Sequence, residues 1–278
     1  MSKNVTTVTI SKTHNMKETL ILALKEAGNE LLNAFGTQIE SKQKESQSSI
    51  VTKVDLKNDK LITGLISSKF PDHNILSEEG GFCNKGSKYT WVIDPLDGTS
   101  NFASAIPWFG VLIALFEGIE PIMGGAYLPV TDQLFVAEKG KGVFKNGMPF
   151  TIGPEKKLKE SLVAFAVDYT DNKEELDNSL RIYRNLVLTS RNIRATNCLF
   201  DFLNVAEGKF GACINLFTRI WDIAALGLII SEAGGVIKDI SGRNVEYFFN
   251  DLTPEHNFPV MAGTETVIKE LIQKVVNK

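Results

Sequence analysis

The segment Asp94–Ser100 combines residue types that could bind a cation and a phosphate. It reads Asp-Pro-Leu-Asp-Gly-Thr-Ser and follows an apolar, β-rich run. Hard divalent cations such as Mg²⁺ prefer oxygen ligands and need only a few converging carboxylates, which Asp94 and Asp97 would supply. Free N–H groups of Gly98 and Thr99 at a helix start would cradle phosphate. The segment therefore predicts a metal and phosphate site, although a lone Asp-x-x-Asp-Gly is also typical of a hairpin turn.

Pro95 predicts a turn directly after the preceding strand. Its ring fixes φ and it has no N–H to donate, so the neighbouring Leu96 carbonyl would be left free to act as a ligand. An EF-hand loop is excluded, because Pro95 occupies its second position and Ala105 stands where the bidentate glutamate belongs.

Three further acids lie where they could join this site. Glu78 precedes a Gly-Gly pair, Asp222 begins an apolar helix, and Asp55 stands at another predicted helix start. Each has an ordinary alternative: a solvated turn for Glu78, a charge favoured by the helix dipole for Asp222, and a helix cap for Asp55. With Asp94 and Asp97, Glu78 and Asp222 would make four carboxylates.

Composition limits the classes of partner. The 278 residues are 43% hydrophobic and 23% charged, with a net charge of −3, which is ordinary for a globular protein and gives no electrostatic case for nucleic acid or anionic membrane. The polar N-terminus and the lack of an apolar run of roughly 20 residues predict a cytoplasmic protein without membrane spans. The cysteines have no CxxC spacing, which argues against disulfides and structural zinc.

Hydrophobic periodicity predicts helices first and a sheet next in the N-terminal half. A helix should run from Asn15 to Phe35, with Asn15 and Glu18 as its capping pair and Gly36 as its stop. An exposed hairpin or loop over 36–49 and a second helix that stops before Pro71 follow. Strands are then predicted at 74–76, 89–93, 111–116, 122–127 and 133–137.

The C-terminal half alternates strands with helices. Strands are predicted at 162–167, near 193, at 211–215 and at 259–262, and helices at 174–187, 199–207, 221–233 and 264–276. The pattern predicts an α+β or α/β layered sandwich of alternating helix and sheet layers. A Gly-Pro pair and a lysine cluster near 150–160 suggest two subdomains: 1–150, with most metal ligands, and 151–278, with Asp222 and the selectivity residues.

Four pieces in this order resemble the inositol monophosphatase family of metal-dependent, lithium-sensitive phosphatases. They are Val-Thr-Lys-Val-Asp at 51–55, Ser-Glu-Glu-Gly at 77–80, Asp-Pro-Leu-Asp-Gly-Thr-Ser-Asn-Phe at 94–102, and Trp-Asp-Ile-Ala-Ala at 221–225 running into Glu-Ala-Gly-Gly at 232–235. The resemblance covers most of the chain, and a chance match of all four is very rare. It implies the layered sugar-phosphatase fold and a homodimer.

The resemblance also implies a ligand set for two or three Mg²⁺ ions. The first would be held by Glu78, Asp94 and the Leu96 carbonyl, the second by Asp94, Asp97 and Asp222, and a weaker third at Glu78. Adjacent cations of this kind would neutralise phosphate, activate a water and stabilise the leaving alkoxide.

Catalytic roles follow from the same resemblance. Thr99 would orient the attacking water, Asp55 would accept the hydrogen bond of the Thr99 hydroxyl, and Glu78 would share the water through its metal. The N–H groups of Gly98 and Thr99 would hold the phosphate. Lys44 lies in the polar loop where the family carries a basic residue near the site, and a solvated lysine is the alternative.

The substrate-contacting positions depart from the inositol-selective pattern. A glycine- and alanine-rich segment is replaced by Arg191–Asn197, which contains Arg194 and Thr196, and Asn215 stands where an acid is usual. With Asp97 and Asp222, these are the candidate substrate residues. Arg194 would add a bidentate donor for a second anionic group; alternatively, it pairs with a surface acid such as Asp201.

The sequence therefore predicts a Mg²⁺-dependent phosphomonoesterase acting on a small phosphorylated polyol, sugar or nucleotide, most like an inositol-1-monophosphatase. Fructose-1,6-bisphosphatase or 3′(2′),5′-bisphosphate nucleotidase activity is the alternative within this chemistry. A non-catalytic metal- or ligand-binding regulator on the same fold is the alternative of another class. The apolar region Phe102–Phe116 would either contribute to a dimer interface or belong to the core.

Overall fold

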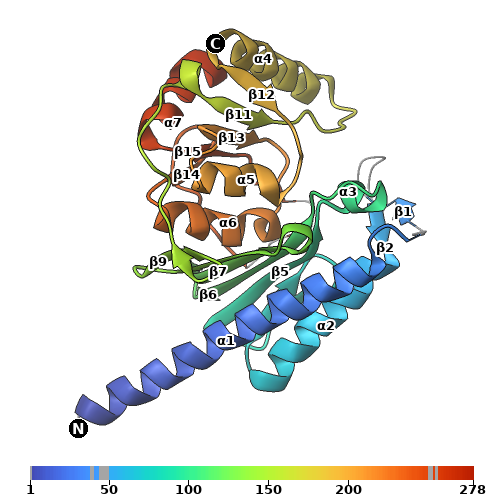
Figure 1. The fold of residues 1–278 in the computed structure, drawn as a ribbon, viewed down its shortest axis with the longest axis vertical. Coiled ribbons are helices and arrows are strands. Elements are labelled where there is room, and N and C mark those ends of the chain that lie inside the picture. Colours follow the sequence, from blue (N-terminus) through green and yellow to red (C-terminus); the bar gives the residue numbers. More distant parts are fainter. Residues whose placement is uncertain (1, 38–40, 44–49, 250–252, 254–255) are drawn as a thin grey trace.

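The computed structural model describes residues 2–37, 41–43, 50–249, 253 and 256–278, which stack into alternating layers of helix and sheet (Figure 1). The predicted layered sandwich is therefore confirmed. The helices are α1 (Ser2–Ala34), α2 (Lys53–Lys69), α3 (Thr99–Ala103), α4 (Lys173–Thr189), α5 (Leu199–Ala206), α6 (Ile220–Glu232) and α7 (Glu265–Leu271), which continues as a π-helical turn (Ile272–Val276). Short 3₁₀ turns lie at Pro129–Thr131 and Leu158–Glu160.

The larger sheet has the strand order β10-β9-β8-β7-β6-β5-β3-β4 and is antiparallel except where β3 runs parallel to β5. Its strands are β3 (Asn74–Ser77), β4 (Gly81–Cys83), β5 (Tyr89–Asp97), β6 (Gly110–Glu117), β7 (Glu120–Leu128), β8 (Gln133–Glu138), β9 (Gly142–Lys145) and β10 (Met148–Pro149). A separate short hairpin pairs β1 (Ser41–Gln43) with β2 (Ile50–Thr52).

The smaller sheet has the order β12-β11-β13-β15-β14, formed by β11 (Leu162–Phe165), β12 (Asn192–Arg194), β13 (Ala212–Asn215), β14 (Val236–Asp239) and β15 (Val260–Gly263). Strand β11 runs parallel to both β12 and β13. The segments that leave these three strands therefore start from the same edge of the sheet. That edge carries the predicted substrate residues.

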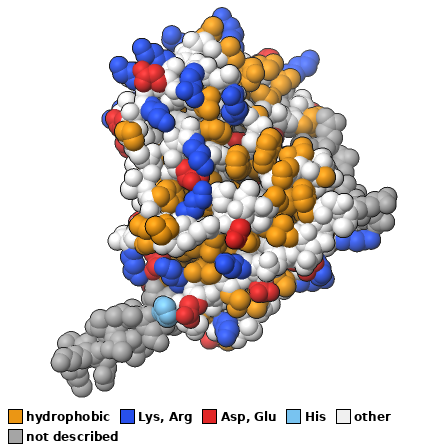
Figure 2. Space-filling model, viewed as in Figure 1, with side chains coloured by type: hydrophobic (Ala, Val, Ile, Leu, Met, Phe, Trp, Pro, Cys, Tyr) orange, Lys and Arg blue, Asp and Glu red, His pale blue; other side chains and the backbone are white. Residues whose placement is uncertain are grey.

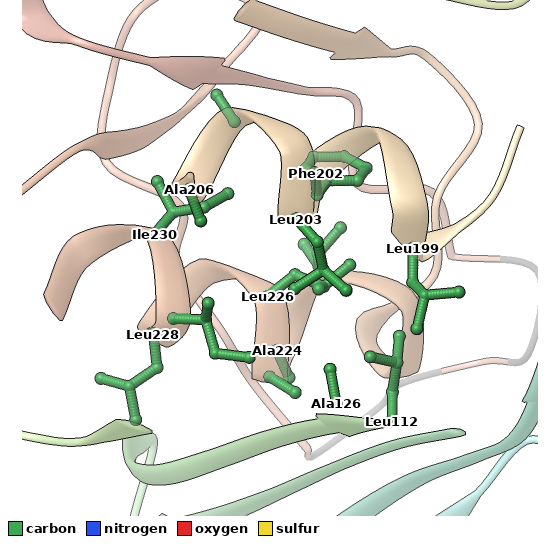
Figure 3. Close-up of a cluster of buried hydrophobic side chains, with 14 of the residues drawn as sticks. Leu112, Ala126, Leu199, Phe202, Leu203, Ala206, Ala224, Leu226, Leu228 and Ile230 are labelled. Carbon is green, nitrogen blue, oxygen red and sulfur yellow. The ribbon is translucent and has the colours of Figure 1, made fainter. Parts of the chain in front are cut away.

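Alternation along the strands of the larger sheet gives it two apolar faces. Trp91 and Ile93 of β5 pack in the cluster with α1 and α2, whereas Val92 between them packs in the cluster with α5 and α6. Figure 3 shows this second cluster, in which α6 lies between α5 and the sheet residues Leu112 and Ala126. The far face of the smaller sheet packs against α4 and α7. Helix α6 is thus enclosed between the two sheets.

The predicted start of the first helix is wrong. Helix α1 begins at Ser2, so Asn15 lies inside it, where its carbonyl accepts a hydrogen bond from the Thr19 hydroxyl at 2.8 Å. No glycine or proline interrupts residues 2–27, so the helical ladder continues past the expected cap. The predicted end is confirmed, because α1 ends at Ala34 and Gly36 takes a φ of +76°.

The longer predicted elements match the observed ones within a few residues, whereas β4, β9, β10 and β14 have no predicted counterpart. Of the hairpin or loop predicted over 36–49, the described residues include β1, whose partner strand β2 begins just after that range, and Lys44 lies outside the described residues. Strands β3–β10 precede residue 150 and β11–β15 follow it, while the division into two subdomains remains a prediction. Within the described part of the chain, no helix has the length and apolarity to cross a membrane.

Candidate metal and phosphate site

The Asp-Pro-Leu-Asp segment lies inside strand β5 and not in a turn after it. Pairing with β6 holds up to Asp94, opposite Leu112, and resumes at Asp97, opposite Gly110, with a shift of register between them. The turn predicted after Ile93 is therefore a bulge within the strand. Because Pro95 cannot donate to the ladder, it is tolerated in such an interruption, and bulges re-aim side chains next to active sites.

Three carboxylates meet at this bulge. Oxygen atoms of Asp94, Asp97 and Asp222 all lie within 4.8 Å of one another. Backbone donors orient each group: Leu96 N–H to Asp94 Oδ1 at 3.0 Å, Leu199 N–H to Asp97 Oδ1 at 2.6 Å, and Arg219 N–H to Asp222 Oδ2 at 2.6 Å. The group therefore joins β5 to the first turns of α5 and α6.

Glu78 approaches the group from the neighbouring strand. It directly follows β3, whose Ser77 is in register with Ile93 of β5, and its N–H donates to the Ile93 carbonyl at 3.1 Å. Its charge is close enough to raise the pKa of Asp94. The structure thus brings together the four carboxylates that the sequence singles out, with Glu78 beside the tight group of three.

Burial and mutual repulsion raise the pKa values of the three clustered carboxyl groups. Loss of water is the largest cause for Asp94, followed by the charges of Glu78, Asp97 and Asp222, and its pKa lies well above the usual range. Burial likewise raises the pKa of Asp97 to about 7, and burial followed by the Asp97 charge raises that of Asp222. A buried set of repelling carboxylate oxygens fits hard divalent cations, which would offset this repulsion.

Thr99 and Asp55 form a second part of the site. The Thr99 hydroxyl lies 3.1 Å from Asp55 Oδ1 and 2.9 Å from the Leu96 carbonyl oxygen. Asp55 is buried and also accepts hydrogen bonds from the hydroxyl and the N–H of Thr52, as the capping residue pair of α2. Asp55 therefore fits both interpretations of the sequence, as the cap of a helix and as the hydrogen-bond acceptor for the Thr99 hydroxyl. The Leu96 carbonyl, predicted to be free, is within hydrogen-bond reach of Thr99.

Gly98 is required by both its backbone angle and its surroundings. Its φ is +84°, and a Cβ there would lie 2.8 Å from the Trp108 carbonyl oxygen and 3.1 Å from the Cys198 Cβ. Only glycine avoids this strain and contact. The absence of a side chain lets the Gly98 backbone pack against Trp108 and Cys198 at the start of α3, next to Asp97.

Three of the candidate substrate residues lie along the shared edge of the smaller sheet. Arg194 ends β12 and Asn215 ends β13, while Thr196 follows β12. Thr196 contacts α3, because Asn101 Nδ2 donates to its carbonyl at 2.9 Å. Asn215 Oδ1 accepts the Phe217 N–H at 3.0 Å.

The alternative that Arg194 pairs with a surface Asp201 is wrong. Asp201 is only 4% exposed, and its Oδ2 accepts the N–H groups of Thr196 and Asn197 at 3.1 and 3.0 Å. The Arg194 guanidinium is exposed and donates to the Ile193 carbonyl at 2.7 Å. Asp201 therefore orders the loop after β12, and Arg194 faces solvent.

Sequence reasoning missed the buried polar residues that support the site. Asn58 Nδ2 donates to the Pro95 carbonyl at 2.6 Å, and Asp59 accepts from the Ser77 hydroxyl. With Asp55 they occupy helical positions i, i+3 and i+4, and Ile62 continues the same buried face. Polar residues at core positions of a helix were the available signal.

Known proteins resemble this chain in sequence and in fold. The Inositol monophosphatase family profile matches residues 12–278. A fructose-1,6-bisphosphatase/inositol-1-monophosphatase of Aquifex aeolicus is 33% identical over 77% of this chain and 82% of its own. The crystal structure of an IMPase from Thermotoga maritima superposes with a TM-score of 0.83 at 27% identity, covering 95% and 97% of the two chains. An IMPase/NADP phosphatase solved with Mg²⁺ and phosphate gives 0.80 at 22% identity over 94% of each chain.

Proposed function

Because the chain belongs to the inositol monophosphatase family and is a phosphatase of that superfamily, we propose that it is a Mg²⁺-dependent phosphomonoesterase. Its substrate would be a small phosphorylated polyol or sugar, most like an inositol 1-phosphate. One observation carries this proposal: the group of three carboxylates lies next to the Thr99 hydroxyl, which is paired with the buried carboxylate of Asp55.

The donor set supports two or three Mg²⁺ ions. Asp94, Asp97 and Asp222 would hold them together with Glu78 and the Leu96 carbonyl, and the solved IMPase/NADP phosphatase of the same fold was bound to Mg²⁺. When bound there, the cations would supply charge neutralisation of the phosphate and a more acidic water. The N–H groups of Gly98 and Thr99 would hold the phosphate oxygens.

Thr99 and Asp55 would orient the attacking water. When the Thr99 hydroxyl donates its proton to Asp55 Oδ1, its oxygen is left to accept a hydrogen bond from that water. Burial raises the pKa of Asp55, which makes this carboxylate a better proton acceptor than an exposed aspartate. Glu78, on the adjacent strand end, would take a second position next to the water.

The reaction class is tested by phosphate release from a panel of phosphomonoesters with Mg²⁺, with a chelator, and with added Li⁺. We expect release that depends on Mg²⁺ and is inhibited by Li⁺. Metal binding without turnover of any substrate would instead favour a non-catalytic regulator on this fold. The carboxylate group with its Thr99–Asp55 pair favours the enzyme, because binding alone does not require an oriented hydroxyl.

Substrates with a second phosphate are the alternative, and the exposed Arg194 favours them because its guanidinium can bind an anion bidentately. The Aquifex aeolicus relative is named for both fructose-1,6-bisphosphatase and inositol-1-monophosphatase activity. In a panel of fructose 1,6-bisphosphate, a 3′,5′-bisphosphate nucleotide and inositol 1-phosphate, Arg194→Ala should lower kcat/KM for the bisphosphates by roughly 10-fold or more. Equal losses on all three would contradict this role, and Arg184→Ala on α4 is the control.

We also propose a homodimer, as the family resemblance implies. The region Phe102–Phe116 belongs mostly to the core, and its exposed large apolar side chains are Ile106 and Trp108. Further apolar side chains, including Leu180 and Val187, are exposed on α4, at the end of the molecule where Figure 2 shows hydrophobic atoms among lysines and arginines. Sedimentation should return the mass of two chains, and a single-chain mass at high concentration would contradict the proposal.

A further inference from the structure

Helix α2 buries a polar surface at its N-terminal end, which is unusual for the core side of a helix. Asp55, Asn58 and Asp59 are 1%, 0% and 8% exposed, and Ile62 and Ile66 continue the same buried face with apolar side chains. Asp55 contacts Thr99, as described above. The two polar residues that remain each contact a different segment that carries predicted metal ligands.

Asn58 holds the bulge of β5. Its Nδ2 donates to the Pro95 carbonyl at 2.6 Å, in the middle of the stretch whose ends are Asp94 and Asp97. Its Oδ1 is buried without a hydrogen-bond partner among the described residues. A buried amide oxygen without a partner destabilises the fold, so burial of the amide does not by itself account for an asparagine here. The Pro95 contact explains why the chain nevertheless places an amide here.

Asp59 holds the turn that follows β3. Its carboxylate accepts from the Ser77 hydroxyl, and the Ser77 oxygen in turn accepts the Gly80 N–H at 3.1 Å. A Cβ on Gly80 would approach Asp59 Oδ2 to 3.3 Å, so the turn lies directly against this carboxylate. Glu78 stands between Ser77 and Gly80 and is therefore held on both sides.

We infer that Asn58 and Asp59 are positioning residues that set Glu78 and the Asp94–Asp97 bulge at a fixed separation. They are consecutive residues of one helical turn, so α2 holds both segments, in addition to the pairing of β3 with β5 and the hydrogen bond from the Glu78 N–H to the Ile93 carbonyl. This inference deepens the proposed function and rests on it. Outer partners that orient metal ligands commonly change metal affinity 10–100-fold when removed.

The test measures Mg²⁺ affinity by calorimetry on the full chain, and kcat at saturating Mg²⁺. Asn58→Leu removes the donor to Pro95, and Asn58→Ala removes it with a smaller side chain, which keeps the test valid if the leucine variant fails to fold. Both should weaken Mg²⁺ binding by about 10–100-fold, with a smaller loss of kcat at saturation. Asp59→Leu should act likewise, whereas Asp59→Asn keeps an acceptor for Ser77 and should restore affinity to within about 3-fold of the original protein.

Asn185→Leu is the matched control. Asn185 is a buried asparagine of α4 whose Nδ2 donates to one backbone carbonyl, that of Val275, at 3.0 Å. It should lower the melting temperature without changing Mg²⁺ affinity. Unchanged Mg²⁺ affinity in Asn58→Ala and Asp59→Leu would overturn the inference. Failure of the unsubstituted protein to bind Mg²⁺ would instead refute the proposed function, so the two failures are distinguishable.

Discussion

Asp94→Asn should abolish Mg²⁺-dependent phosphate release while leaving the metal-free protein at least as stable as before. Asp94 is buried at the bulge, and its carboxylate lies within 4.8 Å of those of Asp97 and Asp222. Asparagine keeps the shape and an oxygen that can accept the Leu96 N–H, but it removes the charge that would bind cations. We expect kcat/KM to fall on the order of 10³-fold or more, beyond the 10–100-fold typical of outer partners.

Stability separates this effect from misfolding. In the metal-free protein Asp94 is repelled by Glu78, Asp97 and Asp222, so its neutralisation removes repulsion and should hold or raise the melting temperature. Asp132→Asn, an exposed aspartate in the left-handed conformation that asparagine also tolerates, is the control and should keep full activity. Activity that survives in Asp94→Asn, or that resists chelation in the original protein, would refute the proposed reaction.

Stabilisation by Mg²⁺ should increase as the pH rises from about 5.5 to about 8. Burial raises the pKa of Asp97 from 3.8 to about 7. Between these values the folded metal-free protein binds a proton that the unfolded chain has lost, so its free energy of unfolding falls as the pH rises. Cations need the deprotonated carboxylate, so below about pH 7 their affinity should fall up to about tenfold per pH unit.

Thermal unfolding with a chelator and with saturating Mg²⁺ checks this expectation. With the chelator the melting temperature should decline across the window, and with Mg²⁺ the decline should be reduced or reversed. Asp97→Asn should reduce the slope of the chelated protein, since one of the carboxyl groups with a raised pKa is gone. A Mg²⁺ effect that is equally large at both ends of the window would contradict a site built on this carboxylate.

Long, strongly periodic elements could be predicted from the sequence, because each buries one regular face. Residues 174–187 and 221–233 read as helices and are α4 and α6 within about two residues at each end. Strands such as β9 and β10 span four and two residues and carry too little pattern. The predicted start of α1 was wrong because the capping pair at Asn15 is only a local signal. The helical hydrogen bonds continue upstream of Asn15 as far as Ser2.

The carboxylates of the site could be named from the sequence, but not their arrangement. The Asp94–Asp97 bulge depends on pairing with β6 and the contact of Asn58 with Pro95, neither of which is local. Asp201 reads as a surface acid because its burial comes only from tertiary packing. Asn58 and Asp59 lie on the helix face that Ile62 and Ile66 mark as buried, but their partners lie on other strands and cannot be read from the sequence of α2.

Helix α6 lies between the two sheets and places Asp222 next to the Asp94–Asp97 bulge. At its other end it binds the turn between β8 and β9, because Glu232 accepts the Gly140 and Gly142 N–H groups at 2.8 Å each. During synthesis this helix leaves the ribosome after every other predicted ligand. A nascent chain that lacks α6 also lacks Asp222 and leaves one apolar face of the larger sheet uncovered. If the proposed function holds, metal binding must therefore follow the synthesis of α6.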